Sequence, residues 1–394
     1  MDWERFGIYV FSAFYGYACL TAPYKGRKWV NRLTVFIILL LLMWLPACDD
    51  TRTITETEYV DRPFVTEPYY TRTVYDENMG EFTTEQQNEL RTKGYITMRL
   101  FYSPRNAGQI WVQAGTPSFG TSLISGVVFG EKLVAGASSG KIGYSTDGDT
   151  WTQSRTPSFG TSSVLDICYG SGYYVAVGND NKIGYSTDGD TWTQSRTPSF
   201  GAGTPITGVV YGDSKYVAVG YYGKIAYSAN RDVWTQAGTP SFGTSIIFNI
   251  AYGNSLFVAV GVSGKIGYSS DADTWTQSSV PNFGTRVIKG IAYGNGRFVA
   301  VGEGGAIAFS FDADVWTQAG TPSFGTSDIE DVFFGAGVFM AVGEDGKIAY
   351  SMDGNSWVQS GTPSFDTSYI YGITYGIGGF IAVGESGKIG ISIN

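Results

Sequence analysis

The chain has 394 residues, of which 54 are glycine, 27 tyrosine and 24 phenylalanine, a composition typical of a globular β protein. Its formal net charge of −9 argues against nucleic acid or an anionic membrane surface as the partner, since both attract basic patches. The sequence contains no histidine, the commonest metal ligand and general base, which disfavours a zinc enzyme or a triad hydrolase. We therefore expect no metal and no cofactor.

Residues 1–48 form a leader. Within residues 25–48, four basic residues precede a mostly apolar run of 13 residues, Leu33–Leu45, which is short for a membrane span and fits a signal-peptide core. A Leu-Pro-Ala-Cys sequence then ends at Cys48 and resembles the bacterial lipobox. The resemblance implies that Cys48 is lipidated and that the protein is exported and lipid-anchored in a bacterial cell envelope. An uncleaved signal anchor is the alternative, and residues 1–24 hold either a further anchor or sequence upstream of the true start.

Residues 49–108 form a polar spacer. As far as about residue 93 the segment is rich in Thr, Glu, Asp and Tyr without a sustained period, which predicts a mostly extended tether. Thr84 and Gln87 fit a capping box and predict a short helix over residues 84–91. Loose alternation over Tyr95–Tyr102 predicts a strand that docks on the following domain. Cys168 is the one cysteine beyond the spacer, so we expect no disulfide there and a buried thiol.

From residue 109 onward one motif recurs to the end of the chain. Its tryptophans are spaced by 40 to 42 residues: Trp111, Trp151, Trp192, Trp234, Trp275, Trp316 and Trp357. A period near 41 with dense strand and turn signals is typical of β-propeller blades. In the repeat that starts at Trp275 we predict strands over residues 287–293, 298–301, 306–310 and 316–318. Residues 109–394 are therefore predicted to form an all-β, seven-bladed propeller of four-stranded blades.

The phase of the repeat predicts how the ring closes. The chain enters at an outermost strand, Ile110–Gln113, and leaves after a third strand, Ile389–Ile393. Pairing the two segments would complete a seventh blade and remove exposed strand edges. Six complete blades with frayed ends is the alternative.

A short motif marks the turn between the third and fourth strands. Ser145–Trp151 reads Ser-Thr-Asp-Gly-Asp-Thr-Trp and recurs as Ser186–Trp192, whereas the third repeat has Asn230 and Arg231 at the Asp and Gly positions. The motif resembles the Asp-box of BNR repeats. We expect its Asp to accept hydrogen bonds from turn amides and its Trp to cover the blade edge, which makes it a folding element.

The Asp-box also occurs in sialidases, and that resemblance implies three arginines, a Tyr–Glu pair and an Asp acid on a six-bladed propeller. Here Arg155 and Arg196 occupy one equivalent position in neighbouring repeats, as copied sequence would. Glu330 and Asp331 are adjacent in one predicted strand and point to opposite faces, so they cannot flank a bond. We predict no catalytic residue, and a sialidase-like glycan-active enzyme is the alternative.

A second resemblance rests on the pattern Val-Ala-Val-Gly-x-x-Gly-Lys-Ile-x-Tyr-Ser-x-Asp-Gly. Met340–Gly354 follows it with Met in the first place, and Val175–Gly189 follows it with Asn181 for the second Gly. The pattern is similar to repeats of the photosystem II stability/assembly factor family and covers the chain from Trp111 onward. The resemblance implies a seven-bladed propeller that acts by binding other proteins. It is specific for the blade type and weak for function, because one fold serves many functions.

Two columns vary while the linkers and strand cores of the repeats are almost copied. The first, near the start of each innermost strand, is Ser125, Leu165, Thr207, Phe248, Lys289, Glu330 and Tyr371. The second, after the end of each second strand, is Ser138, Asn179, Tyr221, Val262, Glu303, Glu344 and Glu385. The linker into the first strand and the turn after the second lie on one face of a propeller, so both columns are expected around one mouth of the channel, where propellers usually bind ligands.

The binding hypothesis selects Phe248, Lys289, Glu330, Tyr371, Tyr221, Glu303, Glu344 and Glu385. Their aromatic share is typical of binding hot spots, and their acidic share favours a cationic or hydrogen-bond-rich protein or glycan ligand. Neutral drift at exposed positions is the alternative. The repeated linker phenylalanines, such as Phe119 and Phe283, are predicted to be plugs between blades. We expect a monomeric, membrane-tethered, non-enzymatic binding or scaffolding propeller.

Overall fold

A computed structural model describes residues 7–12, 17–21, 54–58 and 70–74, and residues 110–393 except for 116–117, 156–158, 197–199, 239–240, 280, 321–323 and 361–364. The chain divides into two units, residues 1–79 and residues 80–394. The signal-peptide segment, Cys48 and the predicted helix over residues 84–91 and strand over Tyr95–Tyr102 lie outside the described residues. No helix among the described residues is long and apolar enough to cross a membrane.

The first unit contains two antiparallel hairpins. One pairs β1 (Gly7–Ser12) with β2 (Tyr17–Thr21), and the other pairs β3 (Ile54–Glu58) with β4 (Tyr70–Val74). The second hairpin lies in the spacer, for which the sequence predicts a mostly extended chain without a sustained period. Its strands read Ile-Thr-Glu-Thr-Glu and Tyr-Thr-Arg-Thr-Val, and this β-branched alternation favours pairing over five residues.

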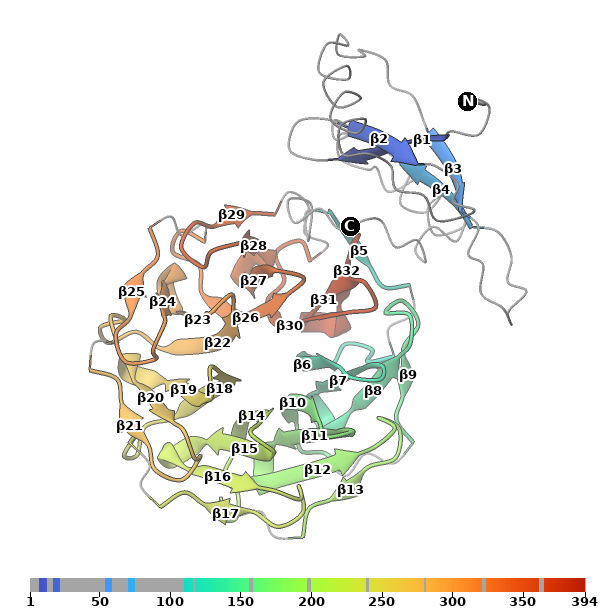
Figure 1. Ribbon diagram of the computed structural model, residues 1–394. Helices are drawn as coiled ribbons and strands as arrows, with labels where there is room; N and C mark the ends of the chain where they lie inside the picture. The colour runs from blue at the N-terminus through green and yellow to red at the C-terminus, as the bar shows by residue number, and fades with distance from the viewer. Residues whose placement is uncertain are drawn as a thin grey trace, which may run out of the picture. The chain divides into compact units, whose positions relative to one another are not determined.

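The second unit contains seven four-stranded antiparallel sheets, which stand as blades around a central channel (Figure 1). The innermost strands are β6 (Ile124–Phe129), β10 (Val164–Gly170), β14 (Ile206–Gly212), β18 (Ile247–Gly253), β22 (Ile288–Gly294), β26 (Ile329–Gly335) and β30 (Ile370–Gly376). The second strands are β7 (Leu133–Ala137), β11 (Tyr173–Gly178), β15 (Lys215–Gly220), β19 (Leu256–Gly261), β23 (Arg297–Gly302), β27 (Val338–Gly343) and β31 (Gly379–Gly384).

The outer half of each blade is shorter. The third strands are β8 (Ile142–Ser145), β12 (Lys182–Ser186), β16 (Ile225–Ser228), β20 (Ile266–Ser269), β24 (Ile307–Ser310), β28 (Ile348–Ser351) and β32 (Ile389–Ile393). The fourth strands are β9 (Thr152–Gln153), β13 (Thr193–Gln194), β17 (Thr235–Gln236), β21 (Thr276–Gln277), β25 (Thr317–Gln318) and β29 (Val358–Gln359), with β5 (Ile110–Gln113) in the last blade. The blades are numbered 1 to 7 from the one that begins with β6. In the repeat that starts at Trp275, the four predicted strands match β22 to β25 to within a residue at each end.

A 3₁₀ turn joins the second and third strands of every blade. These turns are η3 (Ser138–Gly140), η4 (Asn179–Asn181), η5 (Tyr221–Gly223), η6 (Val262–Gly264), η7 (Glu303–Gly305), η8 (Glu344–Gly346) and η9 (Glu385–Gly387). The middle residue of each has a positive φ near 60°, as at Ser139 and Tyr222. In six of the seven turns the last residue is glycine, and its missing Cβ allows close packing: at Gly140 a Cβ would lie 2.1 Å from the carbonyl oxygen of Gly160 in the following linker. In η4 this residue is Asn181.

The ring closes as predicted. β5 pairs antiparallel with β32, so that Trp111 lies opposite Ser392 and Val112 opposite Ile391 (Figure 1). Trp111 and Val112 are 1% and 2% exposed. The seventh blade is therefore a composite of the first and last strands of the propeller, and the alternative of six complete blades with frayed ends is excluded.

The core lies between neighbouring blades, because both faces of the second strands are buried, as in the fully buried β7 and β27. The predicted linker plugs are confirmed: the seven linker phenylalanines are at most 3% exposed. Six lysine ammonium groups each donate to the carbonyl of such a phenylalanine, as Lys182 does to Phe159 at 2.6 Å. Cys168 is buried, as expected.

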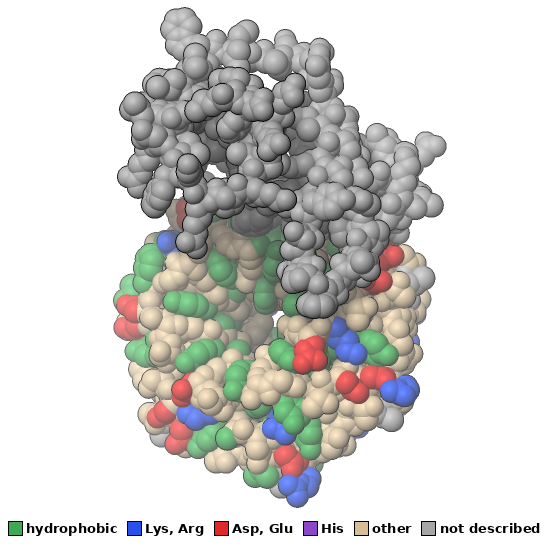
Figure 2. All heavy atoms as spheres, turned by 45° about the vertical axis from the view of Figure 1, so that its right-hand side comes forward, with side chains coloured by type: hydrophobic (Ala, Val, Ile, Leu, Met, Phe, Trp, Pro, Cys, Tyr) green, Lys and Arg blue, Asp and Glu red, His purple; other side chains and the backbone are tan. Residues whose placement is uncertain are grey.

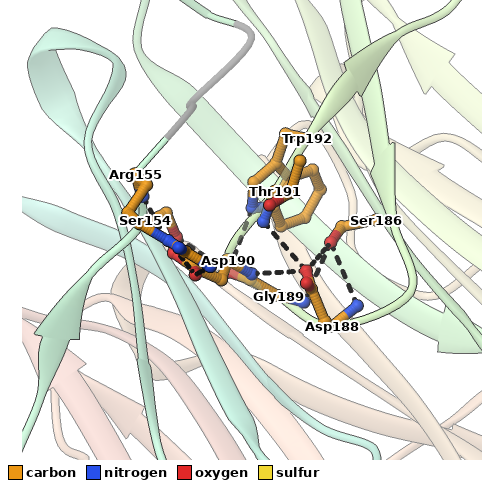
Figure 3. Close-up of polar contacts among 8 residues, drawn as sticks. All are labelled: Ser154, Arg155, Ser186, Asp188, Gly189, Asp190, Thr191 and Trp192. Carbon is orange, nitrogen blue, oxygen red and sulfur yellow. Dashed lines mark hydrogen bonds and ion pairs between the residues drawn. The ribbon is translucent and has the colours of Figure 1, made fainter.

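The turn between the third and fourth strands has the hydrogen bonds that its motif predicts (Figure 3). In blade 2, Asp188 Oδ1 accepts the amides of Asp190 at 2.9 Å and Thr191 at 2.8 Å. The Trp192 indole donates to the Gly189 carbonyl at 3.1 Å and is 6% exposed. In blade 3, Asn230 Oδ1 accepts the equivalent amides at 3.1 and 3.0 Å, so an amide oxygen serves as well as a carboxylate.

The third residue of each innermost strand alternates between glycine and Asp or Asn around the channel. The series is Gly126, Asp166, Gly208, Asn249, Gly290, Asp331 and Gly372. A Cβ added to Gly290 would lie 2.9 Å from the Asp331 Cα of the next blade, so the glycines permit close approach of the backbones. The two aspartates bond across the other junctions: Asp166 Oδ2 accepts the Val209 amide at 2.8 Å, and Asp331 Oδ2 accepts the Ile373 amide at 3.1 Å.

Candidate functional site

The two variable columns lie on one face of the propeller. The first residue of each 3₁₀ turn is tied to the linker that leads into the innermost strand of its own blade: the Glu303 amide donates to the Val287 carbonyl at 3.0 Å, and the Glu344 amide to the Asp328 carbonyl at 3.0 Å. Each residue of the first column is the second residue of an innermost strand. The pairing with the second strand is irregular there, as between Ile288 and Gly290. We call the eight hypothesised residues on this face the rim. Each of them is half-buried.

Lys289 and Glu330, from blades 5 and 6, meet in an ion pair. Lys289 Nζ lies 2.6 Å from Glu330 Oε1 and 2.9 Å from Asp328 Oδ2. Burial alone would lower the pKa of Lys289, but its hydrogen bonds to Glu330 and Asp328 raise it. Burial raises the pKa of Glu330, and its contact with Lys289 opposes that shift. Part of the acidic rim is thus neutralised within the protein.

The three glutamates of the second column hold the linkers of their own blades. Glu303 Oε2 accepts the Val287 amide at 3.0 Å, and Glu344 Oε2 accepts the Asp328 amide at 3.1 Å. Glu385 Oε2 makes the same bond with Tyr369 at 3.2 Å. Each glutamate therefore has a local structural role that spacing alone does not reveal, while its second oxygen remains for other contacts.

The rim aromatics fall in two groups. Tyr371 stacks on Tyr369 in blade 7, with centroids 5.8 Å apart and an interplanar angle of 18°. The Tyr369 hydroxyl donates to Glu344 Oε1, and this bond, followed by burial, raises the pKa of Tyr369 to about 12. In blade 3, Tyr221 meets Tyr222 edge to face at 6.4 Å, and Tyr222 is 61% exposed.

The structure therefore joins Lys289, Glu330, Glu344 and Tyr371 in one network over blades 5 to 7. Tyr221 and Phe248 lie on blades 3 and 4, where η5 packs against β18. Glu303 and Glu385 flank the network through their linker bonds.

Asp328 and Tyr369 are central to this network but are not among the site residues predicted from the sequence. They belong to a third variable column, directly before each innermost strand: Leu123, Ser163, Pro205, Ile246, Val287, Asp328 and Tyr369. All seven residues of this column differ, so the comparison between repeats that found the first column could have found this one too.

The arginines relevant to the sialidase alternative do not converge. Arg155 bonds Asp190 of the next blade through its amide at 2.9 Å and its guanidinium at 2.6 Å (Figure 3). Arg196 bonds Asp232 in the same way at the next junction. Amides that follow other outer strands bond equivalent Asx residues, as Gly238 does with Asp273. The two arginines thus belong to a clasp between neighbouring blades.

Charged side chains are dispersed on the surface. On the side drawn in Figure 2, acidic and basic groups lie interspersed among neutral ones, and no continuous basic patch is seen. The described residues contain no group of three or more His, Cys, Asp or Glu side chains placed to hold a metal ion.

No protein-family model matches the chain, and no curated protein matches it. Solved structures do: virginiamycin B lyase from Staphylococcus aureus, crystallised as an inactive variant with quinupristin, has a TM-score of 0.63 and 17% identity and covers 72% of this chain and 99% of its own. YCF48 from Cyanidioschyzon merolae has a TM-score of 0.57 and 17% identity, covering 72% and 98%. The chain has the fold of these β-propellers.

The matched propellers differ in what they do. YCF48 is also known bound to a D1 peptide, with a TM-score of 0.58, 17% identity and coverage of 75% of this chain and 96% of its own. The WD40 propeller domain of Doa1 matches with a TM-score of 0.57 and 14% identity, covering 71% and 96%. The set thus contains a lyase and a propeller solved with a bound peptide, and identities this low show the fold alone.

Proposed function

We propose that the protein is an exported, membrane-tethered binding propeller, without enzymatic activity, whose rim binds a protein ligand. The observation that carries the proposal is that three variable columns, two of which contain the rim residues, meet on one face of a scaffold that is otherwise almost copied from blade to blade. Propellers usually bind ligands through variable residues that a rigid scaffold holds around one mouth of the central channel. The peptide complex of YCF48 supports a peptide or protein as the ligand class.

The composition of the chain and the contacts of the rim carboxylates support a binding role. The chain has no histidine, and the rim carboxylates of Glu303, Glu330, Glu344 and Glu385 all have partners in linkers or in Lys289. The Asp-box character of the turns, the tether and the bacterial cell envelope as location belong to the same proposal. They rest on the turn hydrogen bonds and on the leader sequence.

Capture of ligands from the envelope of the source cells tests the proposal. Phe248→Ala and Tyr371→Ala should each weaken binding by about 2 kcal/mol, or roughly 30-fold, if they are hot spots. Both side chains are half-buried, so the thermal unfolding midpoint should change little. Met352→Thr is the matched control: it changes an exposed apolar residue in the turn between the third and fourth strands to the residue that blade 1 has there, and should leave binding unchanged.

Two results would overturn the proposal. Wild-type affinity in both rim variants would remove the rim from the binding site. Turnover of any glycoside in a panel that includes sialosides would favour the glycan-active enzyme instead. If a glycan bound without turnover, the rim would still be the binding site, but the ligand would be a glycan and not a protein.

A further inference from the structure

Cations of the protein itself cover aromatic rings beside the turns that join third and fourth strands. In blade 1, Lys132 Nζ lies 3.9 Å from the centroid of the Tyr144 ring. In blade 5, Arg297 Cζ lies 5.4 Å from the Phe309 centroid and 4.8 Å from that of Phe311. Lys132 and Arg297 occupy one equivalent position at the start of the second strand, and Tyr144 and Phe309 one position in the third strand.

In blade 2 a cation also lies over the aromatic rings, but it comes from the neighbouring blade. The residue at the start of the second strand of blade 2 is Tyr173, and the cation comes from the turn of blade 3. Arg231 Cζ lies 3.5 Å from the Tyr173 centroid and 5.5 Å from that of Tyr185. Arg231 has a φ of 61°, in the left-handed region where the equivalent residues are glycine or alanine. Three blades therefore place a guanidinium or ammonium group over the same aromatic surface.

Blade 4 has the aromatic ring without the cation. Tyr268 is the equivalent of Tyr144, but Leu256 replaces Lys132. No Lys or Arg in the described part of the chain lies over the Tyr268 ring. At this place the surface has a depression of about 290 Å³, lined by Leu256, Tyr268, Ser270, Asp271, Thr274 and Thr276.

The depression also carries a negative charge. Asp271 Oδ1 accepts the amides of Asp273 and Thr274, each at 2.8 Å, and these bonds lower the pKa of Asp271 despite partial burial. No described residue bonds its Oδ2, which leaves that atom for a ligand. Lys215 of blade 3 donates to the Asp271 carbonyl at 3.4 Å and pairs with Asp213 at 3.2 Å.

We propose that the blade 4 depression binds a guanidinium or ammonium group, which stacks on the Tyr268 ring next to the Asp271 carboxylate. The protein's own Lys132, Arg231 and Arg297 serve as internal examples of the ligand that this surface accepts. The site lies beside the turn between the third and fourth strands, away from the rim, so it is independent of the proposed function. Cation–π contacts are worth about 0.5–2 kcal/mol, so the site favours a cation over a neutral isostere by roughly 2- to 30-fold.

Titration of the full-length protein with two matched probes tests the site. Acetyl-arginine methylamide should bind saturably, and acetyl-citrulline methylamide, which has the same shape without the charge, should bind several-fold more weakly. Agmatine is a third probe. If agmatine binds more tightly than acetyl-arginine methylamide, the natural ligands are small free amines. If agmatine binds more weakly, the natural ligands are arginine side chains of proteins. Both orders support a cation site.

Two variants locate the binding. Leu256→Arg supplies the residue that blade 5 has at this position, so it should fill the depression from within and weaken the arginine probe at least about 10-fold. Thr193→Arg adds the same charge at an exposed position of blade 2 and should leave binding close to that of the wild type. Asp271→Asn should weaken binding while keeping the turn, because Asn230 makes the same amide bonds in blade 3.

The proposal fails if citrulline binds as tightly as arginine, if Leu256→Arg leaves binding intact, or if the arginine probe shows no saturable binding. Thermal unfolding of each variant distinguishes a filled site from an unfolded one. Because the rim is untouched, capture of envelope ligands should persist in Leu256→Arg, which separates failure here from failure of the proposed function.

Discussion

Asp331 connects two blades through one carboxylate. Its Oδ1 accepts the amide of Val332 in its own strand at 2.8 Å, and its Oδ2 accepts Ile373 of the next blade. The adjacent Glu330 turns to Lys289 instead, which agrees with the predicted opposite orientation of the two acids. Burial raises the pKa of Asp331 to about 8, against the lowering effect of the two amide bonds, and the charges of Asp166 and Glu330 add to the rise.

The raised pKa predicts that the propeller loses stability as the pH rises. The unfolded carboxyl has a pKa of about 3.9, so between about pH 4 and 8 the folded state keeps a proton that the unfolded state has released. The stabilisation is complete below the unfolded pKa and is lost as the pH passes through the folded value. Asp166, whose pKa burial raises to about 6, acts in the same direction.

We expect the wild-type free energy of unfolding to be lower at pH 8 than at pH 5 by on the order of 2 kcal/mol, measured by denaturant titration. Asp331→Asn should flatten this dependence, because the amide does not titrate and Asn249 shows that the position accepts it. Asp366→Asn, at a largely exposed carboxylate, should keep the wild-type slope. Equal slopes in the wild type and Asp331→Asn would contradict the assignment.

At the scale of elements, β5 is a strand of only four residues that closes the ring. It supplies the outer strand of blade 7, and its Trp111 packs with Val338, Met340 and Phe380 between blades 6 and 7. Its pairing joins residues 110 and 393, which are the most distant in sequence within the propeller. Blade 7 therefore depends on one short strand from the other end of the propeller, whereas each of the other six blades consists of consecutive strands.

Trp111→Ala should lower the free energy of unfolding by about 3–5 kcal/mol, since it removes a fully buried indole. Trp192→Ala removes a comparable ring from the interior of the array and is the matched control. Hydrogen exchange distinguishes the two variants: loss of Trp111 should accelerate exchange in β31 and β32, whereas loss of Trp192 should act on blades 1 and 2. Uniform acceleration in both variants would show that β5 has no special role in closure.

The repeat could be predicted from the sequence because its signals are local. The tryptophan spacing, the Asp-Gly turns and short apolar runs such as Phe298–Val301 are each recognised by short-range rules, and their phase predicts the composite blade. Side-chain contacts between neighbouring blades could not be predicted, because they depend on side-chain conformations and strand offsets at each junction, which the repeat pattern does not give. Examples are the Lys289–Glu330 pair, the bridge from Asp331 to Ile373 and the contact of Arg231 with the Tyr173 ring.

For the molecule as a whole, the proposed function assigns binding to the rim and attachment to the leader. The propeller that carries the rim consists of seven blades that restrain one another through linkers, clasps and interblade cores. The proposed attachment relies instead on one lipidated cysteine at the start of a long spacer. Binding and attachment should therefore be separable by mutation.

Cys48→Ser should release the protein from membranes or leave an uncleaved precursor, because a lipid chain on this residue is the proposed anchor. Fractionation of the source cells with mass spectrometry of the N-terminus measures both outcomes. Ligand capture by the solubilised variant should match that of the wild type. Retention of a mature-sized product in the membrane fraction would show that the anchor lies elsewhere.

The alternation of glycine and Asp or Asn around the channel has a consequence that depends on parity. A pattern of period two cannot be carried around a ring of seven, so two like residues must meet once. They meet where Gly372 of blade 7 faces Gly126 of blade 1, and a Cβ on Gly372 would lie 3.3 Å from the Gly126 Cα and 3.1 Å from the Ser125 carbonyl oxygen. A further repeat with Asp or Asn in this column, inserted at that junction, would restore perfect alternation. Of the seven junctions, this is the one at which one added blade would leave glycine alternating with Asp or Asn around the whole channel.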